Sequence, residues 1–136
     1  MPTIAGSCLC GAVRYASSAE PVLTAFCHCR DCQKSGGGGY SVNVAVPTES
    51  LTIEGETRAY RALGASGKPT VRRFCPQCGS PLFTDAEAFS GVSFVKGASL
   101  DDASWIEPNL HIWCGSAQPW DAIPSGATCV VQNPPA

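Results

Sequence analysis

The sequence is poor in charged residues, and no stretch of it is both long and apolar. Charged side chains make up 15% of the 136 residues, and no apolar run approaches the ~20 residues that a transmembrane helix needs. A secretory signal has a basic region followed by an apolar core. The first eleven residues, MPTIAGSCLCG, contain no such pattern. We therefore expect a soluble, cytoplasmic protein that has no membrane partner.

Basic residues are also too few and too scattered to form a nucleic-acid-binding surface. Nine Lys and Arg residues stand against eleven Asp and Glu residues, which gives a net charge of −2. Seven cysteine thiolates with two bound zinc ions would bring this to about −5. A protein this acidic binds nucleic acids poorly, so we expect no nucleic-acid partner, although single Arg or Lys residues could still attract a small anion.

No internal repeat and no linker divides the chain. Its fourteen Gly and eleven Pro residues are spread over the whole length, and 136 residues is an ordinary size for one domain. We predict a single domain over residues 1–136, with its core at about 6–120 and a loose tail at 131–136.

Short segments of alternating character predict a mostly β fold. Every second residue from Tyr40 to Val46 is apolar, which indicates a half-buried strand. Further strands are predicted in VRY, VLTAF, LTIEG, TRAYRAL, TVRRF, PLFTD, GVSFVKG and LHIWC, and short helical turns only in DCQKS, DAEAF and SLDDASW. A domain of this size can bury a core, so we expect small antiparallel sheets held together only partly by metal.

Nine cysteines are the most informative feature of the sequence. A secreted disulfide scaffold would explain such a number, but the number is odd and no export signal is present. Seven of the cysteines also fall into tight groups, which suit a shared metal ion better than disulfides to distant parts of the chain. These groups are Cys8 with Cys10, Cys27 with Cys29 and Cys32, and Cys75 with Cys78.

The segment FCPQCGS contains the C-x-x-C-G pattern of a zinc knuckle. Two intervening residues allow both sulfurs to bind one ion at about 2.3 Å, and the glycine permits the tight turn. The βαβ pattern that surrounds a thioredoxin-like redox motif is missing here. Cys8 and Cys10 in CLCG could complete a closed four-thiolate site with this pair, although the spacing alone does not force that combination.

The segment CHCRDC places three thiols, Cys27, Cys29 and Cys32, within reach of one ion. The fourth ligand could be His28, Cys114, Cys129 or a molecule from outside. If no side chain binds, the metal keeps an open position, as catalytic zinc sites do. Closure by His28 or Cys114 would instead make the site structural, and a metal-free group would be redox-active.

These motifs resemble the glutathione-dependent formaldehyde-activating enzymes. The matching segments are GSCLCGAVRY, CHCRDCQKSGG, RFCPQCGSPLF and PNLHIWCGSAQPW, over about residues 6–120. The resemblance implies one zinc-binding catalytic domain with a β-tent fold, and a carbon–sulfur lyase that joins glutathione to formaldehyde as S-hydroxymethylglutathione, or a relative that uses another small thiol or aldehyde. It implies two zinc ions: a structural ion on Cys8, Cys10, Cys75 and Cys78, and a catalytic ion on Cys27, Cys29 and Cys32.

Three thiolates make zinc a weaker Lewis acid but leave it suited to a soft fourth ligand such as a thiol, whose pKa falls on binding. We expect this ion to be the more easily lost of the two. Because glutathione is a net anion, cationic side chains should surround it. Arg72 is one candidate, and His111 and Trp113 are expected to pack within a strand. The predicted binding residues are Arg30, Lys34, Ser35, Gly36, Gly37 and Arg73.

Two other functions compete with this enzyme: a non-catalytic, zinc-stabilised binding module, and a thiol-based redox or metal-handling protein. The coordination of the CHCRDC cysteines distinguishes the three. An open position favours the enzyme, a closed one favours the module, and disulfide formation favours the redox protein.

Overall fold

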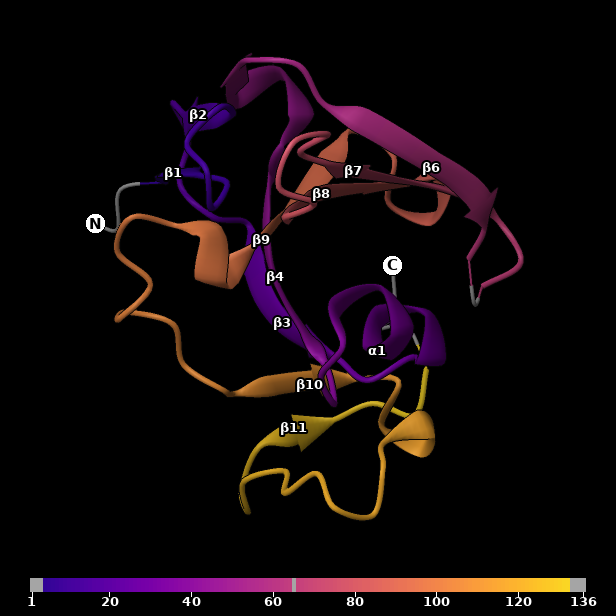
Figure 1. Ribbon diagram of the computed structural model, residues 1–136. Helices are drawn as coiled ribbons and strands as arrows, with labels where there is room; N and C mark the ends of the chain where they lie inside the picture. The colour runs from indigo at the N-terminus through magenta and orange to yellow at the C-terminus, as the bar shows by residue number, and fades with distance from the viewer. Residues whose placement is uncertain (1–3, 65, 133–136) are drawn as a thin grey trace.

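The computed structural model, which describes residues 4–64 and 66–132, is built mainly from two β-sheets (Figure 1). The smaller sheet has the strand order β1-β2-β5, and the larger has the order β11-β10-β3-β4-β9-β8-β7-β6. The strands are β1 (Ala5–Ser7), β2 (Arg14–Ser17), β3 (Leu23–Cys27), β4 (Ser41–Pro47), β5 (Leu51–Glu54), β6 (Arg58–Leu63), β7 (Pro69–Phe74), β8 (Pro81–Ala86), β9 (Val92–Lys96), β10 (Leu110–Ile112) and β11 (Thr128–Cys129). The predicted mostly β class is confirmed.

Helical structure among the described residues is limited to one α-helix and four short 3₁₀ turns. They are α1 (Arg30–Gly36), η1 (Thr48–Ser50), η2 (Glu87–Phe89), η3 (Gly97–Ser99) and η4 (Cys114–Ser116). No helix in the described ranges is long and apolar enough to span a membrane. Two of the predicted helical turns are present as α1 and η2, whereas SLDDASW contributes only its first residue to η3. Residues 133–136 of the predicted tail lie outside the described residues.

Each segment that was predicted to be a strand contains one, but the pairing differs at one end of the larger sheet. β10 runs parallel to both of its neighbours, with His111 opposite Phe26 of β3 and opposite Cys129 of β11. A parallel neighbour needs a long connection, and residues 113–127 provide it between β10 and β11. The expectation of purely antiparallel sheets is therefore wrong here.

β4 is more buried than its alternating sequence predicts. Val44 and Val46 are fully buried, as expected, but Asn43 and Ala45 on the other face are also less than a tenth exposed. β4 lies inside the larger sheet between β3 and β9. The Asn43 side chain accepts a hydrogen bond of 2.8 Å from the Lys96 ammonium on β9, so the polar face of this strand meets other side chains rather than water.

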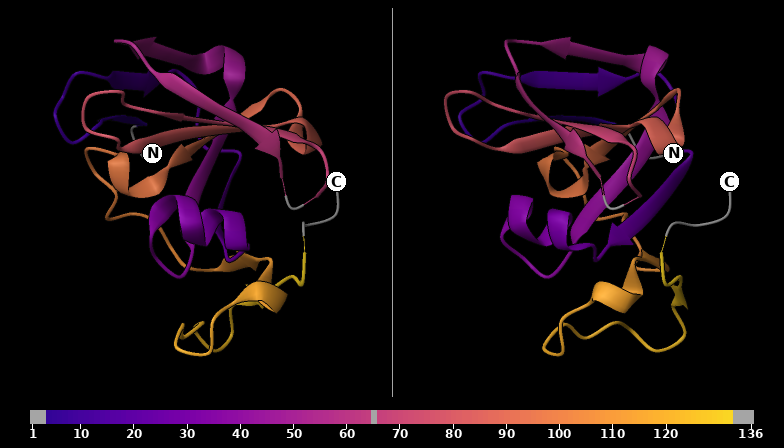
Figure 2. Two further views of the ribbon diagram at one scale, coloured as in Figure 1. Left: turned by 45° about the vertical axis from the view of Figure 1, so that its right-hand side comes forward. Right: turned by 90° about the vertical axis from the view of Figure 1, so that its right-hand side faces the viewer.

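Two clusters of buried side chains lie at opposite ends of the molecule. The larger cluster contains Ile4, Cys8, Val13, Tyr15, Val44, Val46, Cys75, Leu82, Phe83, Val95 and Leu100. The smaller contains Ala25, Cys27, Cys29, Cys32 and Ile112. Figures 1 and 2 show the corresponding arrangement, with β1 and β2 near one end of the long strands β3 and β4, and α1, β10 and β11 near the other. Each cysteine group thus has a hydrophobic surrounding of its own.

We predict that Leu82→Ala lowers the free energy of unfolding by about 2–5 kcal/mol, because it removes a fully buried side chain and leaves a cavity. Leu63→Ala is the matched control, since Leu63 is 68% exposed and its truncation should change stability by less than about 0.5 kcal/mol. Urea unfolding followed by circular dichroism measures both. Equal losses in the two variants would contradict this description of the core.

Candidate metal centres

Two turns bring the first cysteine group together. Cys8 and Cys10 follow β1, while Cys75 and Cys78 lie between β7 and β8, and their four sulfurs are all within 4.8 Å of one another. Cys10 Sγ is 3.7 Å from Cys8 Sγ and 3.8 Å from Cys75 Sγ. A tetrahedron with metal–sulfur bonds of 2.3 Å has edges of about 3.8 Å. The donor set therefore fits a four-thiolate zinc site.

Hydrogen bonds reach three of these sulfurs, and the pKa is lowered for two of the thiols, those of Cys8 and Cys78. The Val13 N–H donates to Cys8 Sγ at 3.3 Å, and the Gln77 N–H donates to Cys75 Sγ at 3.4 Å. The Ser80 hydroxyl, 3.2 Å from Cys78 Sγ, is the main cause that lowers the pKa of Cys78 to about 5. Gly79 has a φ of 77°, a conformation that glycine adopts readily, and this permits the turn predicted from C-x-x-C-G.

The second group lies where β3 passes into α1. Cys27 is the last residue of β3, Cys29 is the N-cap of α1, and Cys32 lies in its first turn, with its N–H 3.3 Å from Cys29 Sγ. All three side chains are buried, and their sulfurs are within 4.8 Å of one another. Hydrogen bonds from Cys27 and Cys29 lower the pKa of Cys32, and the Lys96 ammonium adds to this effect.

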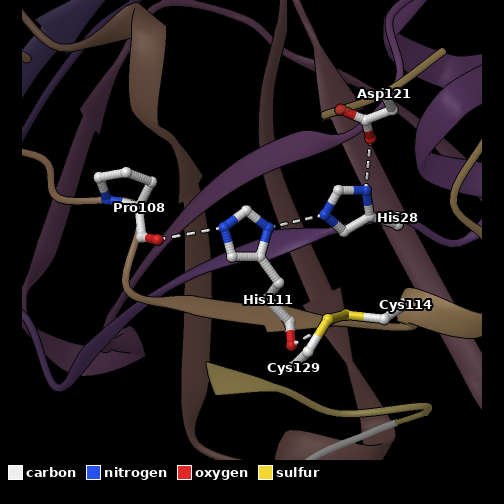
Figure 3. Close-up of a disulfide and its surroundings, with 6 residues drawn as sticks. All are labelled: His28, Pro108, His111, Cys114, Asp121 and Cys129. Carbon is white, nitrogen blue, oxygen red and sulfur yellow. Dashed lines mark hydrogen bonds and ion pairs between the residues drawn. A yellow bond between two sulfur atoms is a disulfide. The ribbon is translucent and has the colours of Figure 1, made fainter. Parts of the chain in front are cut away.

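Each side chain that could supply a fourth ligand to this group is engaged elsewhere. His28 is hydrogen-bonded to His111 and lies next to Asp121 (Figure 3). Cys114 and Cys129 form a disulfide with each other. Among residues 4–64 and 66–132, no fourth Cys, His, Asp or Glu donor joins the three sulfurs. A metal ion bound here has three thiolates and room for a ligand from outside.

A small cavity at this group adjoins a larger one. The smaller, of about 90 Å³, is lined by Cys27, Cys29 and Cys32, and the larger, of about 590 Å³, opens beside it. Five residues line both cavities: Gly64, Thr70, Arg72, Thr84 and Lys96. The larger cavity is also lined by Lys34, Arg73 and Asp31, so cations predominate around it.

Comparisons with known proteins agree with this arrangement. Residues 3–116 match the family described as glutathione-dependent formaldehyde-activating enzyme. A protein of Halomonas elongata that carries this name provisionally is 38% identical over 126 residues, which cover 88% of this chain and 80% of that protein. The chain belongs to the glutathione-dependent formaldehyde-activating enzyme family.

Two more distant relatives extend the comparison. A Talaromyces marneffei protein with the same provisional name is 26% identical over 93 residues, which are 66% of this chain and 49% of that protein. A crystal structure of a Rhodobacter sphaeroides protein superposes with a TM-score of 0.59 at 18% identity, covering 79% of this chain and 98% of the other. The latter likeness concerns the fold alone.

The residues predicted to bind substrate fall into two sets, those that line a cavity and those that do not. Lys34, Ser35 and Arg73 line the larger cavity. Arg30, Gly36 and Gly37 are among the lining residues of neither cavity. The Arg30 guanidinium instead donates to the Gln33 side chain three residues further along α1, a spacing at which helical side chains meet.

Two features of the site differ from the sequence-based expectations. Trp113, for which packing within a strand was preferred to lining a pocket, lines the smaller cavity. Lys96, to which no role was given, faces both cavities from the end of β9. Burial lowers the pKa of Lys96, and the nearby cysteine thiolates oppose that shift. Its place opposite the sulfurs comes from the pairing of β9 with β4, which the local sequence does not reveal.

The disulfide between Cys114 and Cys129 is also a departure, because disulfides were disfavoured for this chain. That argument applied to the seven grouped cysteines, which are indeed free. The remaining two are brought to a Cα–Cα distance of 6.1 Å by the pairing of β10 with β11. They close a loop that carries Gln118 and Asp121, whose side chains contact Gln33 of α1 and His28.

A buried chain of polar groups connects His28 to this loop (Figure 3). His111 Nε2 lies 3.1 Å from the Pro108 carbonyl, which can only accept, and burial lowers the pKa of His111, so this ring is neutral and protonated at Nε2. Its Nδ1 then accepts from His28 Nε2 at 2.8 Å. Asp121 Oδ2 is 2.7 Å from His28 Nδ1. His28 is thus held between His111 and Asp121 in the interior of the protein.

We predict that Asp121→Asn lowers the free energy of unfolding by about 1–3 kcal/mol, because it alters one member of a buried polar pair and leaves the other poorly satisfied. The His28 and Asp121 side chains are 0% and 7% exposed. Asp101→Asn is the control, since Asp101 pairs with Arg14 where both side chains are 55% exposed, and such pairs contribute about 0–1 kcal/mol. Chemical denaturation compares the two, and a loss below about 1 kcal/mol for Asp121→Asn would contradict this role of the buried pair.

Proposed function

We propose that this protein is a zinc-dependent carbon–sulfur lyase that condenses glutathione with formaldehyde, or with a related aldehyde, at an ion held by Cys27, Cys29 and Cys32. One observation carries the proposal: the three sulfurs converge, while His28, Cys114 and Cys129 are all occupied elsewhere. A site of this kind takes its fourth ligand from solution. Zinc bound there would lower the pKa of an incoming thiol and present it as a thiolate.

The cavities supply the rest of the binding site. A volume of about 590 Å³ lies within the range of small-molecule sites, roughly 300–1,000 Å³. Glutathione has two carboxylates and one amine. The cations Lys34 and Arg72 suit the carboxylates, and Asp31 on the same wall suits the amine. Binding the body of the thiol here brings its sulfur to the cysteines, where proximity to the aldehyde accelerates the reaction.

The second zinc ion in this proposal is structural. Cys8, Cys10, Cys75 and Cys78 provide four thiolates, which close the coordination sphere. The seven free cysteines and the thiol substrate both favour a reducing compartment such as the cytoplasm.

The two ions should differ in how easily they are lost. We predict two zinc ions per chain, of which dialysis against a moderate chelator removes one without unfolding the protein, because three ligands hold an ion less firmly than four. Cys29→Ser should bind one zinc ion and remain folded, whereas Cys75→Ser should lose zinc and thermal stability together, since Cys75 is fully buried in the larger core cluster. Elemental analysis and thermal melting measure this, and equal stability of the two variants would count against the assignment.

Thiol ligation can be observed directly after replacement of zinc by Co²⁺. We predict a saturable change in the visible absorption spectrum when glutathione is added, because a fourth sulfur joins the ion at Cys27, Cys29 and Cys32. S-methylglutathione, which has no free thiol, should leave the spectrum unchanged. Cys29→Ser should abolish the change, while Cys10→Ser should retain it.

A Co²⁺ protein that is loaded at both sites and does not respond to glutathione would contradict the proposed function. The protein would then be better described as a zinc-stabilised binding module. Formation of S-hydroxymethylglutathione from ¹³C-formaldehyde, followed by NMR above the spontaneous rate, tests the reaction itself.

A further inference from the structure

Lys96 occupies the boundary between the two cavities. It is the last residue of β9, paired across the sheet with Asn43 of β4. Its Nζ donates to Asn43 Oδ1 at 2.8 Å, and Asn43 Nδ2 in turn donates to Ser41 Oγ at 2.9 Å. An ammonium has three N–H groups. Asn43 takes one of them and fixes the side chain, which leaves the others for a molecule in the cavities.

The smaller cavity has the size for chemistry on one carbon atom but not for binding a tripeptide. Its volume of about 90 Å³ corresponds to roughly three water molecules at about 30 Å³ each. The thiol sulfur and a one-carbon aldehyde fit this space, and the body of the thiol must remain in the larger cavity. The cations that line the smaller cavity are Arg72 and Lys96.

These two cations have different surroundings. Arg72 Nη1 donates to Ser35 Oγ at 3.4 Å, so its guanidinium is directed to the α1 wall of the larger cavity. Lys96 instead donates to Asn43, which lines only the smaller cavity, the one that the three sulfurs of the second group also line. Of the two cations, Lys96 is therefore the better placed to contact an anion that forms next to those sulfurs.

On the basis of the proposed function, we infer that Lys96 is a catalytic residue that binds the aldehyde oxygen and stabilises its negative charge as the carbon–sulfur bond forms. The thiol has already lost its proton to solvent. Its sulfur attacks the carbonyl carbon, the carbon–sulfur bond forms, and the π electron pair of the C=O bond moves onto oxygen. That oxygen accepts hydrogen bonds from the N–H groups of Lys96 and then takes a proton from water. The thiol and formaldehyde thus give the hydroxymethyl thioether with no other reactant.

The test measures kcat and KM of a charge-removing variant. Lys96→Met should lower kcat about 100-fold, which is the size of effect seen when one oxyanion-stabilising donor is removed, with KM for glutathione changed less than about twofold. Lys96→Arg keeps the charge and should recover part of kcat. Lys34→Met, altered in the larger cavity only, should raise KM and spare kcat, and Lys68→Met on the exposed surface is the matched control that should change neither.

Three readouts keep the inference open to refutation. A higher KM with unchanged kcat in Lys96→Met would make Lys96 a ligand of a substrate carboxylate, and no change in either constant would give it no role; both results overturn the inference. The Co²⁺ titration of Lys96→Met should still saturate at the wild-type glutathione concentration. A wild-type protein that neither binds thiol nor forms the adduct would overturn the proposed function itself, which is a separate outcome.

Folding of the variants is checked by thermal melting and by the content of two zinc ions per chain. Lys96→Gln serves if Lys96→Met does not fold, because a glutamine amide can still donate to Asn43 Oδ1 while it carries no charge. Wild-type kcat in a folded Lys96→Gln variant would likewise overturn the inference.

Discussion

The convergence of thiolate sulfurs is the constraint on which the rest of this structure depends. Thiolates repel one another, and their ionised forms are costly to bury. In the first group, sulfurs that are 65 residues apart in the chain lie 3.8 Å from each other. A divalent cation turns this arrangement from unfavourable to favourable. It also fixes the position of the smaller sheet, because the turn after β1 can meet the turn after β7 in only one way.

The second group uses the same chemistry with one ligand fewer, and the difference arises from local geometry. Successive side chains of an extended segment point to opposite sides. Cys27 and Cys29 therefore face the cavities, and His28 between them faces the opposite side, where His111 and Asp121 hold it. The sequence C-H-C thus excludes its own histidine from the metal site. The fourth coordination position at this group lies beside cations from the larger sheet. For this reason an anionic thiol is the proposed substrate.

Local signals predicted the strands and the cysteine groups, because alternation and C-x-x-C spacing are properties of a few neighbouring residues. The features that were missed depend on contacts between distant segments. The disulfide and the pairing of His28 with Asp121 both follow from the parallel position of β10, which no short-range pattern reveals. Arg30 was predicted to bind substrate because it is close to the cysteines in sequence, and in the structure its side chain donates to Gln33 and lines neither cavity.

The loop closed by the disulfide has a consequence for comparison within the family. The family match ends at residue 116, before Asp121 and Cys129. The partner of a histidine located between two cysteines of the second group is therefore supplied by a segment outside the residues that match the family. Relatives that lack this segment have to satisfy that imidazole in some other way, with water or with a different residue. The cysteines of the second group can then stay constant in evolution while the residues that contact the histidine between them are exchanged.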